Sequence, residues 1–315
     1  MSEKEFKLVE CPRDAMQGLH DFVPTALKTE YLNLLLQVGF DTLDFGSFVS
    51  PRAIPQLADT AEVLANLDLD ETHTKLLAIV ANLRGIEAAI KHQAITYLGF
   101  PFSISETFQQ RNTNSSIGQS LVTVEEMLSL CARHSKKAVV YLSMGFGNPY
   151  GDEWNYEIVE KWADILVSKG VEIISLADTV GISTPEKVKE ILPKLIAKFI
   201  NTEIGIHLHS TPADRLEKIE AAYYSGVKRI DSALKGFGGC PMAADDLTGN
   251  IATEDVINIL NLKGENLNLN MAKWHEAMVL SERIFGLPSS LCHGSPRNTE
   301  KNHFRGLITY IVGNS

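Results

Sequence analysis

AVVYLSMGFGNPYGDEWNYEIVEKWADILVSKGVEIISLAD, residues 138–178, contains a strand-like run, a helix-like run and a second strand-like run in succession. The outer runs, residues 138–144 and 172–178, are short and rich in apolar or β-branched side chains, as is typical of strands buried on both faces. Residues 156–170 repeat apolar side chains with the period of a helix and end at a glycine. This order predicts two parallel strands joined by a helix.

The same alternation recurs along most of the chain. Eight strand-like runs occur, at residues 7–14, 41–47, 74–81, 95–103, 138–144, 172–178, 203–210 and 228–236. Helix-period stretches lie between them, for example at residues 25–39, 123–137, 156–170 and 212–226. Eight such units in about 250 residues predict an α/β fold, a TIM (β/α)8 barrel. A doubly wound sheet is the alternative, although no glycine-rich dinucleotide fingerprint follows the first run.

The domain organisation follows from where this alternation ends. ATEDVINIL, residues 252–260, has the pattern expected of the eighth helix. We therefore expect a catalytic barrel domain over residues 1–265 and a helical C-terminal extension over residues 266–315. No linker-like composition separates the two parts, so we expect the extension to pack on the same domain.

Composition excludes several classes of function. The net charge is −10 over 315 residues, which argues against a nucleic-acid or anionic-membrane surface. The first residues, MSEKEFKLVE, lack the apolar core of a signal peptide, and no apolar run is long enough to span a bilayer. The four cysteines show no CxxC pairing, so we expect reduced thiols and a cytoplasmic location.

Polar residues lie at or near the C-terminal ends of several predicted strands. They are Arg13, Asp14, Asp44, Asp178, His207 and His209. A single aspartate at a strand end commonly caps a helix or anchors a loop. Because a barrel places its site at this end of its strands, all six are expected to face one mouth, which favours a functional interpretation.

The residue types in this set indicate a metal site and an anion site. His207 and His209 are two apart in EIGIHLHS, so on a strand both imidazoles leave the same face. A simpler interpretation is a pair of histidines that bond only to their neighbours. Asp14 adds a hard anionic oxygen, and Arg13 offers a planar fork for a carboxylate or a developing enolate. Cys240 follows the glycines of GFGGCP, on a loop expected to be flexible.

The remaining cysteines favour structural interpretations. Cys131 lies in the helical pattern EEMLSLCARH and is expected to be a small buried side chain. Cys292 and His293 form one dipeptide near the C-terminus, which is weak support for a reactive pair.

The run VECPRDAMQG, residues 9–18, resembles the opening motif of the hydroxymethylglutaryl-CoA lyase family, whose members share an R-D-x-x-Q signature on a TIM barrel. The resemblance extends from about residue 8 to 262. It includes segments at residues 45–64, 81–90, 105–121, 205–216 and 232–256. The loop GFGGCP with TGN after it is similar to the lyases rather than to many synthases of the superfamily.

The resemblance implies roles for particular residues. Asp14, His207, His209 and Asn250 match the ligands of a divalent metal, which we expect to be Mg²⁺ or Mn²⁺. Arg13 matches the arginine that stabilises the enolate, and Cys240 matches the catalytic cysteine. Two acidic residues, Asp44 and Asp178, match site carboxylates, although the family commonly has Glu at the first. Gln17 completes the signature, and we expect it to bind substrate together with Arg13 and Asp44.

The implied reaction is cleavage of 3-hydroxy-3-methylglutaryl-CoA to acetoacetate and acetyl-CoA. We therefore expect an acyl-CoA substrate, a homodimer, and a place in leucine catabolism and ketone-body formation, with no nucleic-acid or membrane partner. The candidates for the general base are Asp14, Asp178 and a site histidine, and Cys240 is the candidate acid.

Departures from the family pattern leave the substrate open. Ser210 stands where the lyases usually have Asp, Ala15 stands where they have Gly, and GFGNPYGD replaces a Cys-Pro-Tyr-Glu-Gly loop. A different acyl-CoA or a free hydroxy acid therefore also fits the sequence as a substrate. The chain is further compatible with a related lyase or synthase, with a Schiff-base aldolase that uses Lys235, and with a barrel that binds a ligand without catalysis.

Overall fold

The computed structural model describes residues 6–238 and 248–286 and contains a closed barrel of eight parallel strands. In their order around the barrel, the strands are β1 (Lys7–Glu10), β2 (Thr42–Ser47), β3 (Lys75–Ile79), β4 (Ile95–Ser103), β5 (Lys137–Ser143), β6 (Ile173–Ala177), β7 (Glu203–His207) and β9 (Arg229–Ser232). The barrel closes where β9 pairs in parallel with β1. The TIM-barrel prediction is confirmed, and the doubly wound sheet is excluded.

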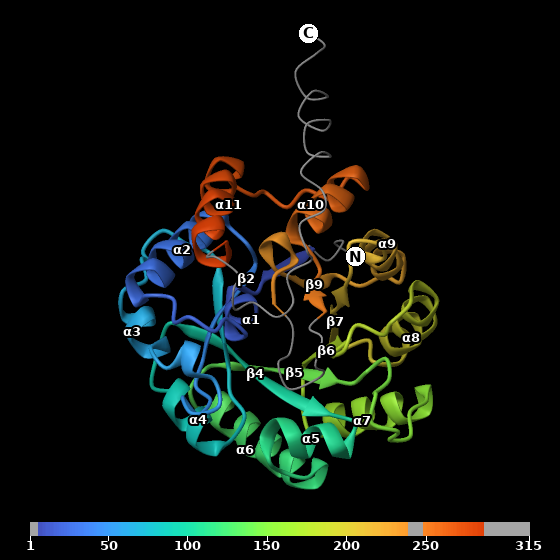
Figure 1. Ribbon diagram of the computed structural model, residues 1–315. Coiled ribbons are helices and arrows are strands. Elements are labelled where there is room, and N and C mark those ends of the chain that lie inside the picture. The colour runs from blue at the N-terminus through green and yellow to red at the C-terminus, as the bar shows by residue number, and fades with distance from the viewer. Residues whose placement is uncertain (1–5, 239–247, 287–315) are drawn as a thin grey trace.

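Helices form a ring around these strands, whereas the short α1 (Pro12–Gln17) lies near the centre of the view (Figure 1). The helices of the ring are α2 (Thr25–Val38), α3 (Thr60–Ala65), α4 (Leu83–Ala89), α5 (Glu106–Thr113), α6 (Ile117–Arg133), α7 (Tyr156–Ser168), α8 (Pro185–Lys198), α9 (Arg215–Tyr224), α10 (Thr253–Leu262) and α11 (Met271–Phe285). Short 3-10 turns occur at η1 (Pro55–Leu57) and η2 (Leu234–Gly236). Within the described ranges, no helix combines the length and apolar character needed to cross a bilayer.

The apolar side chains of the strands contribute to two separate buried clusters. Side chains that point outward join the large core beneath the helices, whereas Leu77, Tyr97, Val139, Tyr141 and Ile173 pack together in a second cluster. Because successive side chains of a strand point to opposite faces, both faces of each strand are buried. This explains why the strands are near-continuous apolar runs in the sequence.

The last described helix, α11, packs against α2 on the outside of the barrel (Figure 1). Trp274 meets Phe40 edge to face, with ring centroids 6.3 Å apart, and Phe285 meets Tyr31 in the same way at 6.2 Å. Helix α11 therefore belongs to the same core as the barrel. Residues 287–315 of the expected extension lie outside the described residues, and the boundary at residue 265 stays a prediction.

Several strands end earlier than their apolar patterns predict, and two of these differences shape the site. The run predicted over residues 7–14 ends at Glu10, because Pro12 begins helix α1. The run predicted over residues 203–210 divides after His207. Its last residues, His209–Ser210, form β8, which pairs antiparallel with β10 (Gly249–Asn250) above the barrel.

Candidate active site

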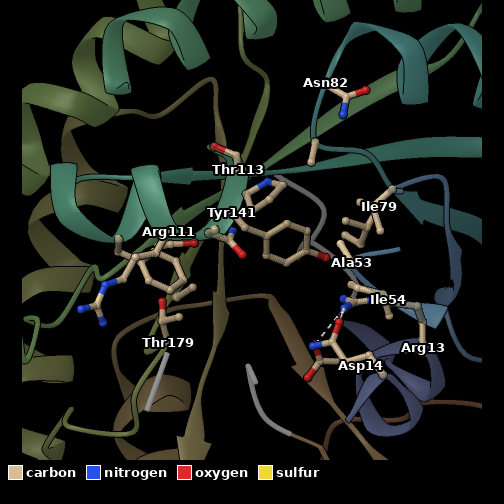
Figure 2. Close-up of a pocket in the computed structure, with 18 of the residues that line it drawn as sticks. Arg13, Asp14, Ala53, Ile54, Ile79, Asn82, Arg111, Thr113, Tyr141 and Thr179 are labelled. Atoms are coloured by element: carbon tan, nitrogen blue, oxygen red, sulfur yellow. Dashed lines mark hydrogen bonds and ion pairs between the residues drawn. The ribbon is translucent and has the colours of Figure 1, made fainter. Parts of the chain in front are cut away.

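A cavity of about 440 Å³ opens at the C-terminal ends of the strands (Figure 2). Residues from many separate segments surround it. Those used below are Arg13, Asp14, Gln17, Val49, Ala53, Ile54, Asn82, Phe108, Arg111, Asn112, Thr113, Asn114, Tyr141, His207 and His209. The cavity therefore lies where a barrel is expected to carry its site.

One wall of the cavity holds a candidate metal-binding group. Ligand atoms of Asp14, His207 and His209 all lie within 4.8 Å of one another. The two histidines face each other, with 3.3 Å between their Nε2 atoms. They come from β7 and β8, and the turn at Leu208 between these strands brings the imidazoles together. We call Asp14, His207 and His209 the metal side of the cavity, together with Asn250, which bonds to Asp14 but is not among the cavity-lining residues of the described chain.

Asn250 completes this side from β10. Its Nδ2 donates to Asp14 Oδ2 and to the Phe237 carbonyl, both at 2.8 Å. Its Oδ1 is buried and has no hydrogen-bond partner among the described residues. A buried amide oxygen without a partner costs about 1–3 kcal/mol, which coordination to a cation offsets. Two imidazoles, a carboxylate and this oxygen form a donor set that fits a divalent metal.

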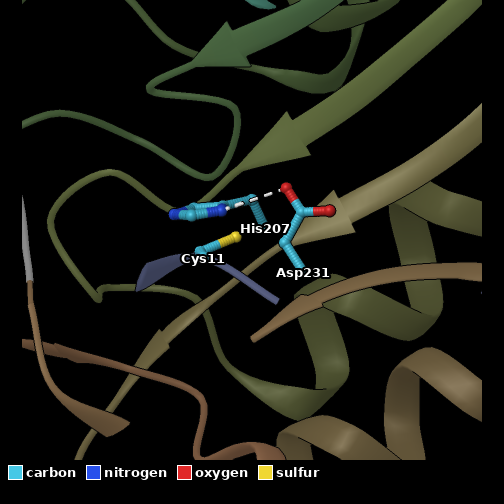
Figure 3. A group of neighbouring side chains, drawn as sticks. All are labelled: Cys11, His207 and Asp231. Carbon is cyan, nitrogen blue, oxygen red and sulfur yellow. Dashed lines mark hydrogen bonds and ion pairs between the residues drawn. The ribbon is translucent and has the colours of Figure 1, made fainter. Parts of the chain in front are cut away.

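Asp231 on β9 orients His207 from behind (Figure 3). Its Oδ2 lies 3.2 Å from His207 Nδ1, and a carboxylate in this position favours the tautomer with its proton on Nδ1, which leaves Nε2 of the neutral ring for a metal. Cys11, His207 and Asp231 also have ligand atoms within 4.8 Å of one another. However, Cys11 and Asp231 are fully buried beneath the cavity, and burial raises the pKa of the Cys11 thiol. We interpret them as support for His207.

The charge states of Asp14 and His209 suit a cation. Burial opposes ionisation of Asp14, but Arg13 and the two histidines outweigh it and lower its pKa to about 2. Burial, together with the neighbouring His207, lowers the pKa of His209 to about 4. Burial also acts against protonation of His207, but the Asp231 carboxylate outweighs it and raises the pKa. Near neutral pH, an ionised carboxylate and a neutral imidazole are therefore ready to bind a metal.

Arg13 is held rigidly beside the metal side. Its Nε and Nη2 donate to the Asp44 carboxylate over 2.5–3.2 Å. Its Nη1 donates to Asp14 Oδ1 and Gln17 Oε1, both at 2.9 Å. Gln17 Nε2 in turn donates to Asp14 Oδ1 at 2.9 Å. Helix α1 therefore presents the whole R-D-x-x-Q signature to the cavity.

Two predicted site carboxylates lie behind the cavity wall. Among the described residues that line the cavity, neither Asp44 nor Asp178 is present. Burial outweighs the Arg13 charge and raises the pKa of Asp44 to about 6. The Asp178 carboxylate accepts from the Ser183 backbone and hydroxyl at 3.0 and 2.5 Å, and it lies 3.5 Å from Lys218 Nζ. The expectation that six groups face one mouth is therefore met by Arg13, Asp14, His207 and His209.

Other residues singled out in the sequence are placed as follows. Cys240, Cys292 and His293 lie outside the described residues. Cys131 is buried in α6, as expected. Lys235 Nζ donates to Glu282 Oε1 on α11 at 2.9 Å, and Lys235 is not among the cavity-lining residues of the described chain. Among the described residues, no lysine lines this cavity, so a Schiff-base mechanism has no support from this part of the chain.

The divergent positions of the family pattern lie near the cavity but outside its described lining. In the described chain, Ala15, Asn148, Asp152 and Ser210 do not line it. Ser210 is buried in β8, next to the metal side, and its hydroxyl has no hydrogen-bond partner among the described residues. The residues that differ from the lyase motifs thus surround the site without forming its wall.

The sequence patterns missed the opposite side of the cavity. Figure 2 shows Arg111 and Thr113 across the cavity from Arg13 and Asp14. Phe108, Arg111, Asn112, Thr113 and Asn114, which we call the α5 side, belong to helix α5 and its C-cap. Their spacing carries no metal or catalytic motif. Asp231 was missed as well, although a carboxylate inside the apolar run RIDSAL was a visible signal.

Comparisons with known proteins agree with this geometry. The family described as HMGL-like matches residues 6–280. The chain is 36% identical over 273 residues to the cytoplasmic 3-hydroxy-3-methylglutaryl-CoA lyase of Rattus norvegicus, covering 86% of this chain and 78% of the relative. It is 32% identical over 275 residues to a hydroxymethylglutaryl-CoA lyase of Bacillus subtilis, covering 84% and 90%.

Solved structures give the same result. The HMG-CoA lyase of Bacillus subtilis superposes with a TM-score of 0.84 at 30% identity, covering 91% of this chain and 97% of that one. An HMG-CoA lyase of Acinetobacter baumannii, in complex with coenzyme A and 3-methylmalate, superposes with a TM-score of 0.82 at 28% identity, covering 95% and 97%. With its R-D-x-x-Q helix and paired histidines in one barrel mouth, the chain belongs to the HMGL-like family.

Proposed function

We propose that the protein is a metal-dependent carbon–carbon lyase that cleaves 3-hydroxy-3-methylglutaryl-CoA into acetoacetate and acetyl-CoA. One observation carries the proposal: Arg13, Asp14, His207 and His209 converge on a single cavity. The lyases of Rattus norvegicus and Bacillus subtilis, with which the chain shares about a third of its residues, support this choice of substrate.

The metal is held by Asp14, His207, His209 and Asn250 in this proposal. These oxygen and imidazole donors favour Mg²⁺ or Mn²⁺ over a closed structural zinc site. When bound, such an ion polarises the substrate hydroxyl and carboxylate and lowers the pKa of the hydroxyl. Asp231 and Gln17 keep His207 and Asp14 in position through the hydrogen bonds described above.

The reaction requires one proton to leave and one to arrive. The C3 hydroxyl loses its proton, the C2–C3 bond breaks, C3 becomes the ketone of acetoacetate, and the electron pair forms the enolate of acetyl-CoA. Among the described residues, the candidate bases Asp14, His207 and His209 line the cavity, and we favour them as the proton acceptor over Asp178, whose carboxylate bonds to Ser183. We assign protonation of C2 to Cys240, on the strength of the resemblance alone.

Arg13 stabilises the enolate in this mechanism. Its guanidinium is buried and is held by Asp44, Asp14 and Gln17, so it does not have to reorganise as charge develops on the thioester oxygen. A preorganised donor of this kind is among the strongest contributions to a rate. We infer that Asp44 acts through Arg13 and does not contact the substrate.

An acyl-CoA substrate suits the remaining walls. Val49, Ala53 and Ile54 provide an apolar surface for the acyl chain. Arg111 on the α5 side is exposed and offers a guanidinium to the phosphates of coenzyme A. The homologous lyase bound to coenzyme A and 3-methylmalate supports this proposal. A homodimer, a cytoplasmic location, and roles in leucine catabolism and ketone-body formation complete it, on the strength of the resemblance.

The test is release of acetyl-CoA from hydroxymethylglutaryl-CoA by the purified full-length protein, with Mg²⁺, with Mn²⁺ and with a chelator. We expect turnover that depends on the metal and collapses in Cys240→Ala. Turnover that persists in chelator would contradict the metal site. Binding of metal and coenzyme A without turnover of this or related hydroxyacyl-CoA thioesters would favour a ligand-binding barrel instead.

A further inference from the structure

The loop GFGNPYGD, residues 145–152, is a rigid turn that closes on itself. Asn148 Oδ1 accepts from the backbone N–H groups of Tyr150 and Asp152 at 3.0 and 3.1 Å. Asn148 Nδ2 donates back to the Asp152 carbonyl at 2.9 Å. An asparagine that bonds its own backbone in this way stabilises a turn without help from other elements.

The same loop is fastened to the barrel. Trp154 Nε1 donates to the Gly145 carbonyl at 3.2 Å. Lys187 Nζ on α8 donates to the Phe146 carbonyl at 3.1 Å. The loop is therefore held by the segment that precedes α7 and by α8.

From this support, the Asp152 carboxylate reaches the first turn of α5. It accepts from the Ser105 hydroxyl at 2.5 Å, the Thr107 backbone N–H at 3.0 Å and the Thr107 hydroxyl at 2.9 Å. Ser105 is itself the N-cap of α5 and accepts from the Phe108 N–H at 3.1 Å. The bond from Ser105 lowers the pKa of Asp152, so the carboxylate is charged at neutral pH. A negative charge at a helix N-terminus is favourable.

Tyr150 from the same loop makes a second attachment farther along α5. Its ring stacks on Phe108, with centroids 6.3 Å apart and 12° between the planes. The ring also contacts the Arg111 guanidinium, whose central carbon lies 4.7 Å from the ring centroid. Phe108 and Arg111 are both members of the α5 side of the cavity.

We propose that residues 145–152 form a brace that positions the α5 side of the cavity, with Asp152 and Tyr150 as positioning residues for substrate affinity. Neither residue lines the cavity in the described chain, so both act through α5. The proposal deepens the proposed lyase function and rests on it for the identity of the substrate. It also means that the divergent GFGNPYGD loop supports substrate binding and does not by itself indicate a different substrate.

The test compares Asp152→Ala with Glu153→Ala, a control at an exposed neighbouring position of the same connection. In Asp152→Ala we expect KM for hydroxymethylglutaryl-CoA to rise about tenfold, because three bonds to a charged group are lost, while kcat stays within about twofold. Asp152→Asn, which keeps an acceptor oxygen, should recover part of the loss. Tyr150→Leu should raise KM by about threefold through loss of the ring contacts.

Two readouts do not depend on turnover. Hydrogen exchange of the unliganded full-length protein should show faster exchange of the amides at 106–113 in Asp152→Ala but not in Glu153→Ala. Calorimetric binding of coenzyme A should weaken in parallel with the rise in KM. If the wild type does not cleave hydroxymethylglutaryl-CoA, the proposed function is wrong. Hydrogen exchange and coenzyme A binding still test whether residues 145–152 position α5.

The brace is overturned if exchange at 106–113 and coenzyme A affinity match the wild type in Asp152→Ala. It is also overturned if kcat falls as far as kcat/KM, because that result would place Asp152 in the chemistry. If Asp152→Ala does not fold, the milder Asp152→Asn and Tyr150→Leu variants decide by the same two readouts.

Discussion

The metal side and the α5 side enclose the same cavity but are built differently. Asp14, His207, His209 and Asn250 are all buried, and the pKa values of the three titratable members are perturbed. On the α5 side, Arg111 and Asn114 are exposed, and the helix depends on a loop from another part of the chain. The difference indicates that chemistry resides on short, buried segments at strand ends, whereas affinity depends on how a helix is braced.

The largest effect should come from the metal side. His209→Ala removes one of two facing imidazoles, and we expect kcat/KM to fall by at least about 10³-fold. Isothermal titration with Mn²⁺ should show weaker binding at the same time. The control is His275→Ala, at an exposed position on α11. Normal metal binding with lost activity would show that His209 acts in another way than as a ligand.

Arg13→Met should have the next largest effect. The variant keeps most of the apolar stem but loses the guanidinium that opposes the enolate, so we expect kcat to fall about 10²- to 10³-fold with little change in KM. Steady-state kinetics with hydroxymethylglutaryl-CoA measure the split, and Arg133→Met, on the surface of α6, is the control. A rise in KM at unchanged kcat would show that Arg13 contributes to ground-state binding of the substrate and not to stabilising the enolate.

Asp231→Asn tests the support behind the metal side. An amide keeps the shape but not the charge next to His207 Nδ1, so we expect metal affinity to fall about 10- to 100-fold. Titration with Mn²⁺ measures this directly. Asp164→Asn, exposed on α7, should leave the affinity unchanged. Unchanged affinity in Asp231→Asn would mean that β7 alone orients the imidazole.

Arg111→Ala should affect binding only, because it lies on the α5 side. We expect KM for the acyl-CoA to rise about tenfold through loss of a charge-assisted contact, with kcat within about twofold. Raising the salt concentration should reduce the difference between variant and wild type. Arg283→Ala on α11 is the matched control. A fall in kcat comparable to that of Arg13→Met would show that the α5 side takes part in the chemical step as well as in substrate binding.

The smallest expected effect is on how the stability of the folded protein changes with pH. Burial raises the pKa of Glu10, whose carboxylate on β1 accepts from the Leu234 backbone N–H and the Thr253 hydroxyl, to about 8. Between the unfolded value of about 4.5 and this value, the folded state holds a proton that the unfolded state has lost, so stability falls as pH rises, by up to about 1.4 kcal/mol per pH unit. Asp152 has a lowered pKa, so its contribution is present above its ordinary value of 3.8 and is lost as pH falls below it.

Thermal unfolding of Glu10→Gln from pH 5 to 8.5 measures this contribution. We expect Tm of the variant to rise relative to the wild type by a few degrees as pH increases. Glu157→Gln, exposed on α7, should show no such trend. Parallel Tm profiles for Glu10→Gln and the wild type would show that Glu10 is ionised in the folded state.

Much of the fold was readable from local patterns. All eight strands were predicted, and β4 has the bounds that its apolar run suggested. The paired histidines and the signature on α1 were also visible, because each is a short segment whose spacing decides which face its side chains share. By contrast, Asp44 and Asp178 could not be placed from sequence, because an aspartate near a strand end has the same pattern whether it points into the cavity or behind it.

By itself, the sequence determined the barrel, the grouping of Arg13, Asp14, His207 and His209, and the acidic charge balance of the chain. These follow from the period of apolar residues, the directions of side chains on a strand, and net charge. Only the tertiary structure decided that Asp231 supports His207, that Asn250 reaches Asp14, and that Asp152 braces α5. Each of these contacts joins segments far apart in the chain, and their meeting depends on how the barrel closes and packs.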